Sequence, residues 1–338
     1  MSLVAASKKF SSVSFITNRY YVKAAVVVGG TSGGIWSGDP VDVVHSMDST
    51  TREWSKLSIS PRHFTYPFGF SMVAVESQLY VVGFTDTTDR HYTSSQGPYI
   101  NRFLSKFDPN HNIWEYLPPM ESVRVGSVLL ASSAELFLIG GVDPSSYSLR
   151  TCSTLETYCI HRNVWTEGVS TPSRSFVHAA GAKLGGVFYV LGGIVNFDVT
   201  ASMETLAYTV SPNSRWATST PMIFCRSAFG VVALKFCIIA CGGCNIENPN
   251  GIASTESFDI RTGVWTLLES MLLPRIGFAI AVCNEKVYIF GGSTGDENTD
   301  NAYSTVEYFT PSTGSWTFGT PMPLPRTGAC ARFVGLKR

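Results

Sequence analysis

The stretch RIGFAIAVCNEKVYIFGGSTGDENTDNAYSTVEYFTPSTGSW, Arg275–Trp316, decides the fold, because its parts recur along the chain. Its last residue belongs to a series of tryptophans whose successive gaps are 60, 51, 51, 49 and 51 residues. The series consists of Trp54, Trp114, Trp165, Trp216, Trp265 and Trp316. A fixed period of about fifty residues indicates a repeat architecture, in which each unit must pack against its neighbours.

Three other features keep the same period. A short apolar run ends in Gly-Gly in five units and in Gly83-Phe84 in the remaining one. An aromatic residue stands seven or eight positions before each of the last five tryptophans, and Met47 stands near that position in the first unit. These aromatic residues are Phe107, Tyr158, Tyr208, Phe258 and Tyr308. An arginine follows each tryptophan by eight to ten positions, at Arg62, Arg124, Arg174, Arg226, Arg275 and Arg326.

The unit predicts four antiparallel strands. Apolar runs rich in Val, Ile, Phe and Tyr indicate buried strands, and Gly-Gly at a strand end allows a positive φ or a close backbone approach. The Tyr or Phe marks a third strand, the Trp opens the fourth after a turn, and the Arg leads into the next unit. Four strands in about fifty residues are typical of a propeller blade, with the aromatic residues filling the space between blades.

Paired glycines, then a tyrosine, then a spaced tryptophan make this unit resemble the kelch repeat. Six repeats cover nearly the whole chain. The resemblance implies an all-β, six-bladed kelch β-propeller with four antiparallel strands per blade, and we expect a single domain over residues 1–338.

A propeller avoids open strand edges by closing its ring. RTGACARFVG, Arg326–Gly335, begins like the first strand of a blade, yet no further blade follows it. We therefore predict that residues 326–338 supply the innermost strand of blade 1. The alternative is FSSVSFIT, Phe10–Thr17. If the C-terminal strand closes the ring, residues 1–20 are an outer strand or a leader.

Composition limits the classes of function. The formal net charge is zero, which argues against a nucleic-acid binder. No apolar run approaches the roughly 18 residues of a membrane span, and the N-terminus lacks the pattern of a signal peptide, so we expect a cytoplasmic location. The spacing of the eight cysteines does not suggest a disulfide framework. Cys241-Gly-Gly-Cys244 matches C-x-x-C, but nothing nearby completes a metal site, and two cysteines flanking the repeated glycine pair explain it.

No catalytic motif is assignable. The six histidines form no H-x-x-x-H pair, and no nucleophile elbow, P-loop or dinucleotide fingerprint is present. A galactose-oxidase-type copper site cannot be assembled from the sequence, and SFDIRTGVW, Ser257–Trp265, has the wrong spacing for a sialidase aspartate box. We predict no enzyme, no cofactor and no metal. The alternative is an enzyme acting on a small polar or anionic, carbohydrate-like substrate at the channel mouth, because propeller sites draw single residues from many blades.

The recurrent arginines are the main candidate site. Placed at the starts of the innermost strands, they would surround one mouth of the channel and suit capture of carboxylates. In the kelch-domain adaptors of ubiquitin ligases that the chain resembles, arginines at these strand starts contact acidic peptides. The resemblance implies a partner-binding role for Arg62, Arg124, Arg174, Arg226, Arg275 and Arg326. The structural alternative packs each arginine against a neighbouring blade, with Glu121 and loop aspartates as internal counter-charges.

Loops after the strand that ends in Gly-Gly are the second candidate surface, because loops on a rigid scaffold carry recognition. Aromatic residues in these polar loops are predicted partner contacts. They are Trp36, Tyr92, Tyr147 and Phe197. The predicted function is a protein-interaction module that docks a peptide or loop, acidic if the arginines bind it. The resemblance implies substrate recognition in a cullin-ligase adaptor, or binding to the actin cytoskeleton.

Overall fold

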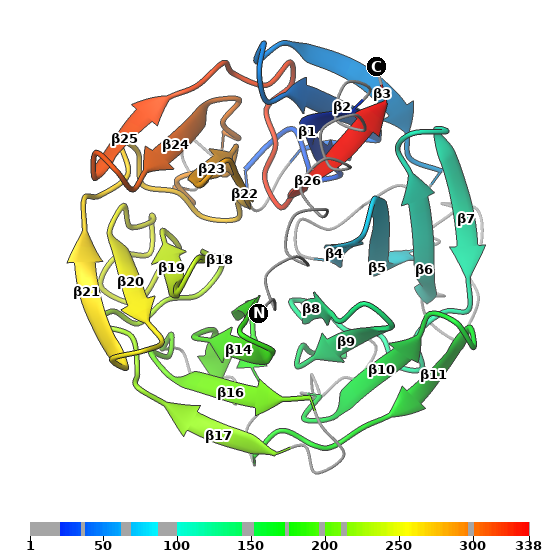
Figure 1. The fold of residues 1–338 in the computed structure, drawn as a ribbon, viewed down its shortest axis with the longest axis horizontal. Helices are drawn as coiled ribbons and strands as arrows, with labels where there is room; N and C mark the ends of the chain where they lie inside the picture. The colour runs from blue at the N-terminus through cyan, green and yellow to red at the C-terminus, as the bar shows by residue number, and fades with distance from the viewer. Residues whose placement is uncertain are drawn as a thin grey trace, which may run out of the picture.

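The computed structural model describes residues 21–34, 38–61, 69–86, 100–143, 152–172, 176–195, 200–210, 215–296 and 301–337. Strands are the regular elements of these residues, and six four-stranded antiparallel sheets stand around a central axis (Figure 1). This confirms the all-β, six-bladed propeller. Within the same ranges, no helix is present that could cross a membrane.

Four strands make up each blade and follow one another from the channel to the outer wall. Blade 1 consists of β26 (Cys330–Lys337), β1 (Tyr21–Val28), β2 (Val43–Asp48) and β3 (Trp54–Ile59). Blade 2 consists of β4 (Phe70–Val75), β5 (Gln78–Asp86), β6 (Ile100–Asp108) and β7 (Ile113–Leu117). Blade 3 consists of β8 (Val128–Ala131), β9 (Glu135–Ile139), β10 (Leu155–Cys159) and β11 (Val164–Glu167).

The other three blades follow the same order. Blade 4 consists of β13 (Ala180–Leu184), β14 (Val187–Leu191), β16 (Thr205–Thr209) and β17 (Trp216–Ser219). Blade 5 consists of β18 (Gly230–Leu234), β19 (Cys237–Cys241), β20 (Thr255–Asp259) and β21 (Val264–Leu268). Blade 6 consists of β22 (Ala279–Cys283), β23 (Lys286–Phe290), β24 (Val306–Thr310) and β25 (Ser315–Phe318). Beside blade 4, β12 (Phe176–Val177) pairs with β15 (Ile194–Val195).

The C-terminal strand closes the ring, as its Arg-x-Gly start predicts. β26 pairs antiparallel with β1 over its whole length, from Cys330 opposite Val28 to Lys337 opposite Tyr21. The last strand of the chain thus becomes the innermost strand of the first blade and joins the two ends of the chain in one sheet (Figure 1). The alternative strand, Phe10–Thr17, lies outside the described residues.

The hydrophobic core is divided into six clusters, and each cluster lies between two neighbouring blades. Between blades 5 and 6, for example, Ile239 and Phe278 pack with Ile289 and Trp316. Within a blade, the tryptophan packs on the aromatic residue of the third strand, as in Phe258–Trp265 with ring centroids 5.1 Å apart and ring planes inclined by 33°. In blade 6 this partner is Phe309 rather than the predicted Tyr308, because the cross-strand register places Phe309 opposite Trp316.

The tryptophans also bond to the preceding blade. The indole Nε1 of Trp265 donates to the carbonyl of Thr220 at 3.0 Å, and that of Trp316 donates to the carbonyl of Glu269 at 2.9 Å. Trp165 does the same with Pro118 at 2.8 Å. The indole nitrogen of Trp216 has no such partner among the described residues.

The glycine pairs have the positive φ that the sequence predicts. Gly242 and Gly243 adopt φ of 66° and 87°. A Cβ on Gly243 would lie 2.5 Å from the carbonyl oxygen of Ser227, so a side chain cannot be accommodated. Blade 2 differs locally: where Phe84 replaces the second glycine, β5 continues to Asp86 and stays paired with β6.

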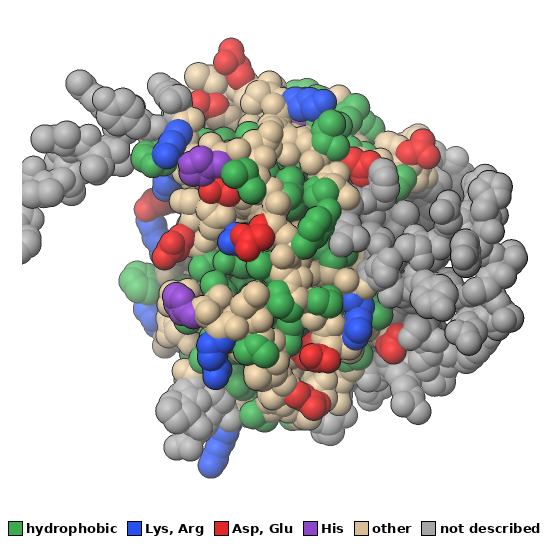
Figure 2. Space-filling view, turned by 90° about the vertical axis from the view of Figure 1, so that its right-hand side faces the viewer, with side chains coloured by type: hydrophobic (Ala, Val, Ile, Leu, Met, Phe, Trp, Pro, Cys, Tyr) green, Lys and Arg blue, Asp and Glu red, His purple; other side chains and the backbone are tan. Residues whose placement is uncertain are grey.

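The two ends of the ring carry different connections. First and third strands start at one end, which we call the loop end; it holds the segments after each glycine pair and the segments that enter each new blade. The opposite turn end holds the tight turns inside each blade. Figure 2 views the wall of the ring from the side of β6 and β7, and there the His side chains lie toward the left, whereas Lys and Arg side chains are spread across the wall.

Replacing a tryptophan by phenylalanine separates its hydrogen bond from its packing. Trp265→Phe is expected to lower the free energy of unfolding by about 0.5–1.5 kcal/mol more than Trp216→Phe, because only the first removes a bond to the preceding blade. Urea unfolding of the two variants and the parent measures the difference. Equal losses would contradict a contribution from these bonds.

Candidate functional site

Three of the predicted arginines form one recurrent buried arrangement, which we call the arginine clamp. In blade 5, Arg226 Nε donates to Glu256 Oε1 at 2.8 Å, and Nη1 donates to the carbonyls of Gly242 and Ser254 at 2.8 and 3.0 Å. Neither Arg226 nor Glu256 is exposed at all. The guanidinium therefore points away from the channel into the blade, where it joins the first strand to the second and third.

The same clamp occurs in blades 3 and 6. Arg124 Nη2 donates to Glu156 Oε1 at 2.8 Å, and Arg275 Nη2 donates to Glu307 Oε1 at 2.7 Å. Each also bonds to the carbonyl of the first glycine of its pair, Gly140 at 3.2 Å or Gly291 at 2.6 Å. Burial lowers the pKa of Arg275, but the adjacent Glu307 charge opposes that shift.

Blade 1 has a variant of the clamp with a histidine in place of the carboxylate. Arg326 Nη1 donates to the carbonyl of Gly29 at 2.7 Å, and Nη2 contacts His45 Nδ1 at 2.8 Å. Desolvation lowers the pKa of Arg326 to about 10. Desolvation and the neighbouring Arg326 charge lower the pKa of His45 to about 4. His45 is therefore a neutral acceptor, and the contact ties the closing strand to β2.

The clamp carboxylates also hold the segments that enter each blade. Glu256 Oε2 accepts the backbone N–H of Ile223 at 2.6 Å, and Glu307 Oε2 accepts that of Leu272 at 2.7 Å. Glu156 Oε2 accepts the N–H of Glu121 at 3.0 Å. Glu121 is therefore not the internal counter-charge that the sequence predicts; its backbone bonds to the true counter-charge, Glu156.

Blade 4 replaces the ion pair by an apolar pair. In four of the glycine pairs, the second glycine donates its N–H to the carbonyl of the clamp position in the next blade, as Gly243 does to Arg275 at 2.8 Å. In blade 4 this position is Phe176, which accepts from Gly141 at 2.8 Å. The position of the glutamate is taken by Leu206, and both side chains are buried in the same cluster. The register thus differs from the sequence prediction, which assigns Arg174 to this position.

Burial corrects the predicted role of four arginines. Four of the arginines are at most 2% exposed; they are Arg124, Arg226, Arg275 and Arg326. Their guanidinium groups donate hydrogen bonds inside the blades, so a partner cannot reach them. This corresponds to the structural alternative. The other predicted contacts lie outside the described residues; they are Arg62, Arg174, Trp36, Tyr92, Tyr147 and Phe197. Their roles stay predictions.

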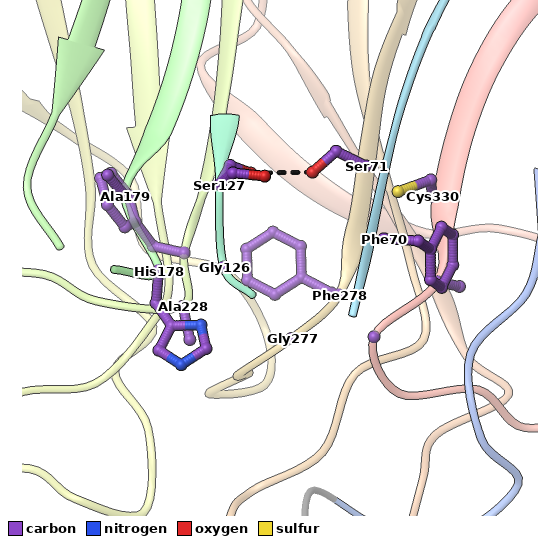
Figure 3. Close-up of a pocket in the computed structure, with 13 residues that line it drawn as sticks. Phe70, Ser71, Gly126, Ser127, His178, Ala179, Ala228, Gly277, Phe278 and Cys330 are labelled. Carbon is purple, nitrogen blue, oxygen red and sulfur yellow. Dashed lines mark hydrogen bonds between the residues drawn. The ribbon is translucent and has the colours of Figure 1, made fainter. Parts of the chain in front are cut away.

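A cavity of about 130 Å³ lies on the channel where the innermost strands begin (Figure 3). Its lining comes from all six blades and includes Phe70, Gly126, His178, Ala228, Phe278 and Cys330. Ser71 Oγ donates to the carbonyl of Ser127 at 2.8 Å across two blades. Desolvation lowers the pKa of His178 to about 4. The lining is therefore neutral near pH 7 and offers a single imidazole.

The C-x-x-C cysteines flank the glycine pair, as the repeat register indicates. Burial raises the pKa of the Cys241 thiol to about 12 and also raises that of Cys244, whose Sγ lies 3.4 Å from Ser227 Oγ. All eight cysteines are free thiols. In the described part of the chain, no three His, Cys, Asp or Glu side chains gather as a metal site would require.

Sequence reasoning missed a group of exposed apolar residues at the loop end, which we call the apolar arc. It consists of Met203, Ile223, Phe224, Ile246, Leu272 and Leu324. The signal was present in MIFCR and MLLPR, where apolar residues stand between a buried methionine and the clamp arginine. The corresponding segment of blade 3, MESVR, is polar at Glu121 and Ser122.

Removing one partner of a clamp should be costly. Glu256→Leu leaves the Arg226 charge buried without its carboxylate, so the free energy of unfolding should fall by about 3–5 kcal/mol. Arg226→Phe/Glu256→Leu reproduces the apolar pair of blade 4 and should lose less than the sum of the single changes, by about 0.5–3 kcal/mol. Denaturant unfolding of all four proteins tests this, and additive losses would contradict the clamp.

The histidine variant of the clamp predicts a pH dependence. The pKa of His45 is about 4 in the folded protein, below the ordinary 6.5, so the unfolded state binds the proton more tightly. This contribution is complete above pH 6.5 and is lost as the pH falls to about 4. His45→Gln keeps an acceptor for Arg326 and should flatten the decline of the melting temperature in this window. An unchanged decline would contradict the assignment.

Comparison with known proteins agrees with the repeat. The Kelch motif family matches residues 225–272 and 274–323. Kelch-like protein 26 of Danio rerio is 26% identical over 72% of this chain, and Kelch-like protein 35 of Mus musculus is 25% identical over 86%. Kelch repeat and BTB domain-containing protein 1 of vaccinia virus is 24% identical over 77%.

The chain spans 38–44% of the length of these relatives. The solved structure of YjhT superimposes on 87% of this chain and 98% of its own, with a TM-score of 0.69 and 14% identity, a likeness of fold alone. Six blades with glycine pairs and with tryptophans packed on aromatic residues, two Kelch motif matches and kelch-like relatives together support a kelch-repeat family for this chain.

Proposed function

We propose that this propeller is a protein-interaction module that docks a peptide or loop of another protein on its loop end. The observation that carries this proposal is the apolar arc, because exposed apolar side chains on a fixed scaffold are typical of interaction sites. Its segments are held by the clamp carboxylates Glu256 and Glu307. Binding therefore costs little ordering of the protein. The kelch-like relatives support the same class of function.

At a finer level, we propose that the propeller recognises substrates for a cullin-ligase adaptor in the cytoplasm. The support is the name of the vaccinia virus relative, which contains a BTB domain beside its kelch repeats. Actin is the second candidate partner, on the resemblance alone. Co-immunoprecipitation of the full-length gene product with cullin subunits tests the adaptor role, and its absence in cells that express the protein would contradict it.

The prediction of an acidic partner loses its physical basis in the described residues. It depends on free guanidinium groups at the channel mouth, and four of them are buried in clamps. The enzyme alternative also gains no support from the channel mouth, where the described lining is neutral near pH 7 and burial lowers the pKa of its single imidazole, His178, to about 4.

A photo-crosslinker placed at each end tests docking on the loop end. Ile246 is 63% exposed on the loop end, and Phe236 is 54% exposed in a turn of the same blade at the opposite end. Benzoylphenylalanine at position 246 should crosslink a discrete protein in cell extract, whereas position 236 should not. A partner captured equally from both positions would contradict docking on the loop end.

A further inference from the structure

The segments that enter the blades at the loop end differ in the side chains that they expose. The segments that enter blades 5, 6 and 1 present Ile223, Phe224, Leu272 and Leu324, whereas the segment that enters blade 3 presents Glu121 and Ser122 at the matching positions. Among the described segments that enter a blade, exposed apolar residues therefore gather over blades 5, 6 and 1. Ile59 and Val169, at the ends of the outer strands of blades 1 and 3, are exposed at the loop end as well.

The members of the apolar arc lie on connected segments. The backbone N–H of Met222 bonds to Met203 at 2.8 Å, which joins the entry to blade 5 to the preceding loop of blade 4. The amide of Asn245, next to Ile246, donates to the carbonyl of Cys225 at 3.2 Å. The N–H of Arg275 bonds to Ile252 at 3.4 Å, which joins the loop of blade 5 to the entry of blade 6. These bonds join the neighbouring segments that carry Met203, Ile223, Ile246 and Leu272 over blades 4 to 6.

The exposed charged side chains along the apolar arc are acidic. The acidic residues at the loop end of these blades are Glu204, Glu247, Glu269 and Asp296. Over residues 200–210, 215–296 and 301–337, the arginines at this end are the buried clamp members and Arg332, which is half-buried on β26 and bonds to the carbonyls of Ile280 and Ala331. The exposed cations of these ranges lie toward the turn end; they are Arg215, Lys235, Arg261 and Lys337.

The clamps produce this separation of charge. Arg226 and Arg275 are neutralised by Glu256 and Glu307 inside the blades, so they project no net positive charge to the rim. Glu247 and Glu269 are exposed beside Ile246 and Leu272 and keep their negative charge at the surface. A ligand that covers the arc must supply apolar side chains and cations together.

We propose that the apolar arc docks a basic peptide segment, in which Lys or Arg residues alternate with bulky apolar residues. This inference rests on the proposed function and names the chemistry of its partner. The apolar side chains of the peptide would cover Ile223, Phe224 and Leu272, and its cations would lie beside Glu247 and Glu269. The positive charge of this peptide is opposite to the charge of the acidic partner that the arginines predicted.

Fluorescence polarisation with the purified 338-residue chain tests the proposal. The probes are three labelled synthetic peptides of equal length: one of Lys/Arg with Leu/Phe, one of Asp/Glu with the same Leu/Phe, and one of Lys/Arg with Ser. We expect only the first to bind in the micromolar range, and weaker binding when NaCl rises from about 0.05 M to about 0.5 M, because salt screens exposed charges.

Matched variants locate the site. Ile223→Ser/Leu272→Ser should weaken binding about tenfold or more, because buried anchors dominate interface energetics. Phe236→Ser, at the turn end, should leave it unchanged. Glu247→Lys/Glu269→Lys should weaken binding about tenfold, and the control Glu285→Lys, at the turn end, should not. The clamps bond to backbone N–H groups at positions 223 and 272, so the serine variants keep the fold.

Each other outcome is decisive. Preference for the acidic peptide would overturn the basic-peptide inference while docking on the loop end stands. Loss of binding in Phe236→Ser alone would place the site at the turn end and overturn both the inference and docking on the loop end. Binding of none of the three peptides, together with no crosslink from position 246, would overturn both the inference and the proposed function. Self-association abolished by Glu247→Lys/Glu269→Lys would identify a second copy of the chain as the occupant and overturn the inference.

Discussion

The fold of each clamped blade depends on a charge that is buried where three strands meet. A buried guanidinium is costly to desolvate. Arg226 is stable there because Glu256 and two backbone carbonyls accept hydrogen bonds from it. These bonds fix the glycine-pair strand and the third strand relative to the first. The carboxylate then fixes the entering segment through its backbone N–H. One buried pair therefore sets the geometry of a blade and of the rim above it.

Blade 4 shows that the ring does not require the charge everywhere. Phe176 and Leu206 fill the same two positions and are packed in the core between blades 3 and 4. Replacing a buried ion pair by apolar residues is often neutral for stability. What the apolar pair lacks is an acceptor for the entering segment. In blades 5 and 6 that acceptor holds Ile223 and Leu272 in place, which suits a surface that must meet a partner already ordered.

Much of the fold was predictable because packing imposes a period on the sequence. Each tryptophan must cover one blade interface, so its spacing reveals the blades, and the Arg-x-Gly start of the last segment correctly predicted the closing strand. The spacing of the arginines was less informative, because loop lengths vary: Arg174 keeps the distance from Trp165, yet Phe176 keeps the register. The burial of the arginines depended on glutamates far along the chain, although Glu256, two residues before Phe258, was a visible signal.

Hydrogen–deuterium exchange of single amides tests the clamp most directly. The amides of Ile223 and Leu272 lie in surface segments with exposed side chains, but each bonds to a buried carboxylate. We predict slow exchange at both positions. On the same rim we predict fast exchange at Ile246, whose side chain is also exposed but whose amide bonds to no carboxylate among the described residues. Exchange at Ile223 and Leu272 as fast as at Ile246 would contradict the account, because the rim would not be held by the clamps.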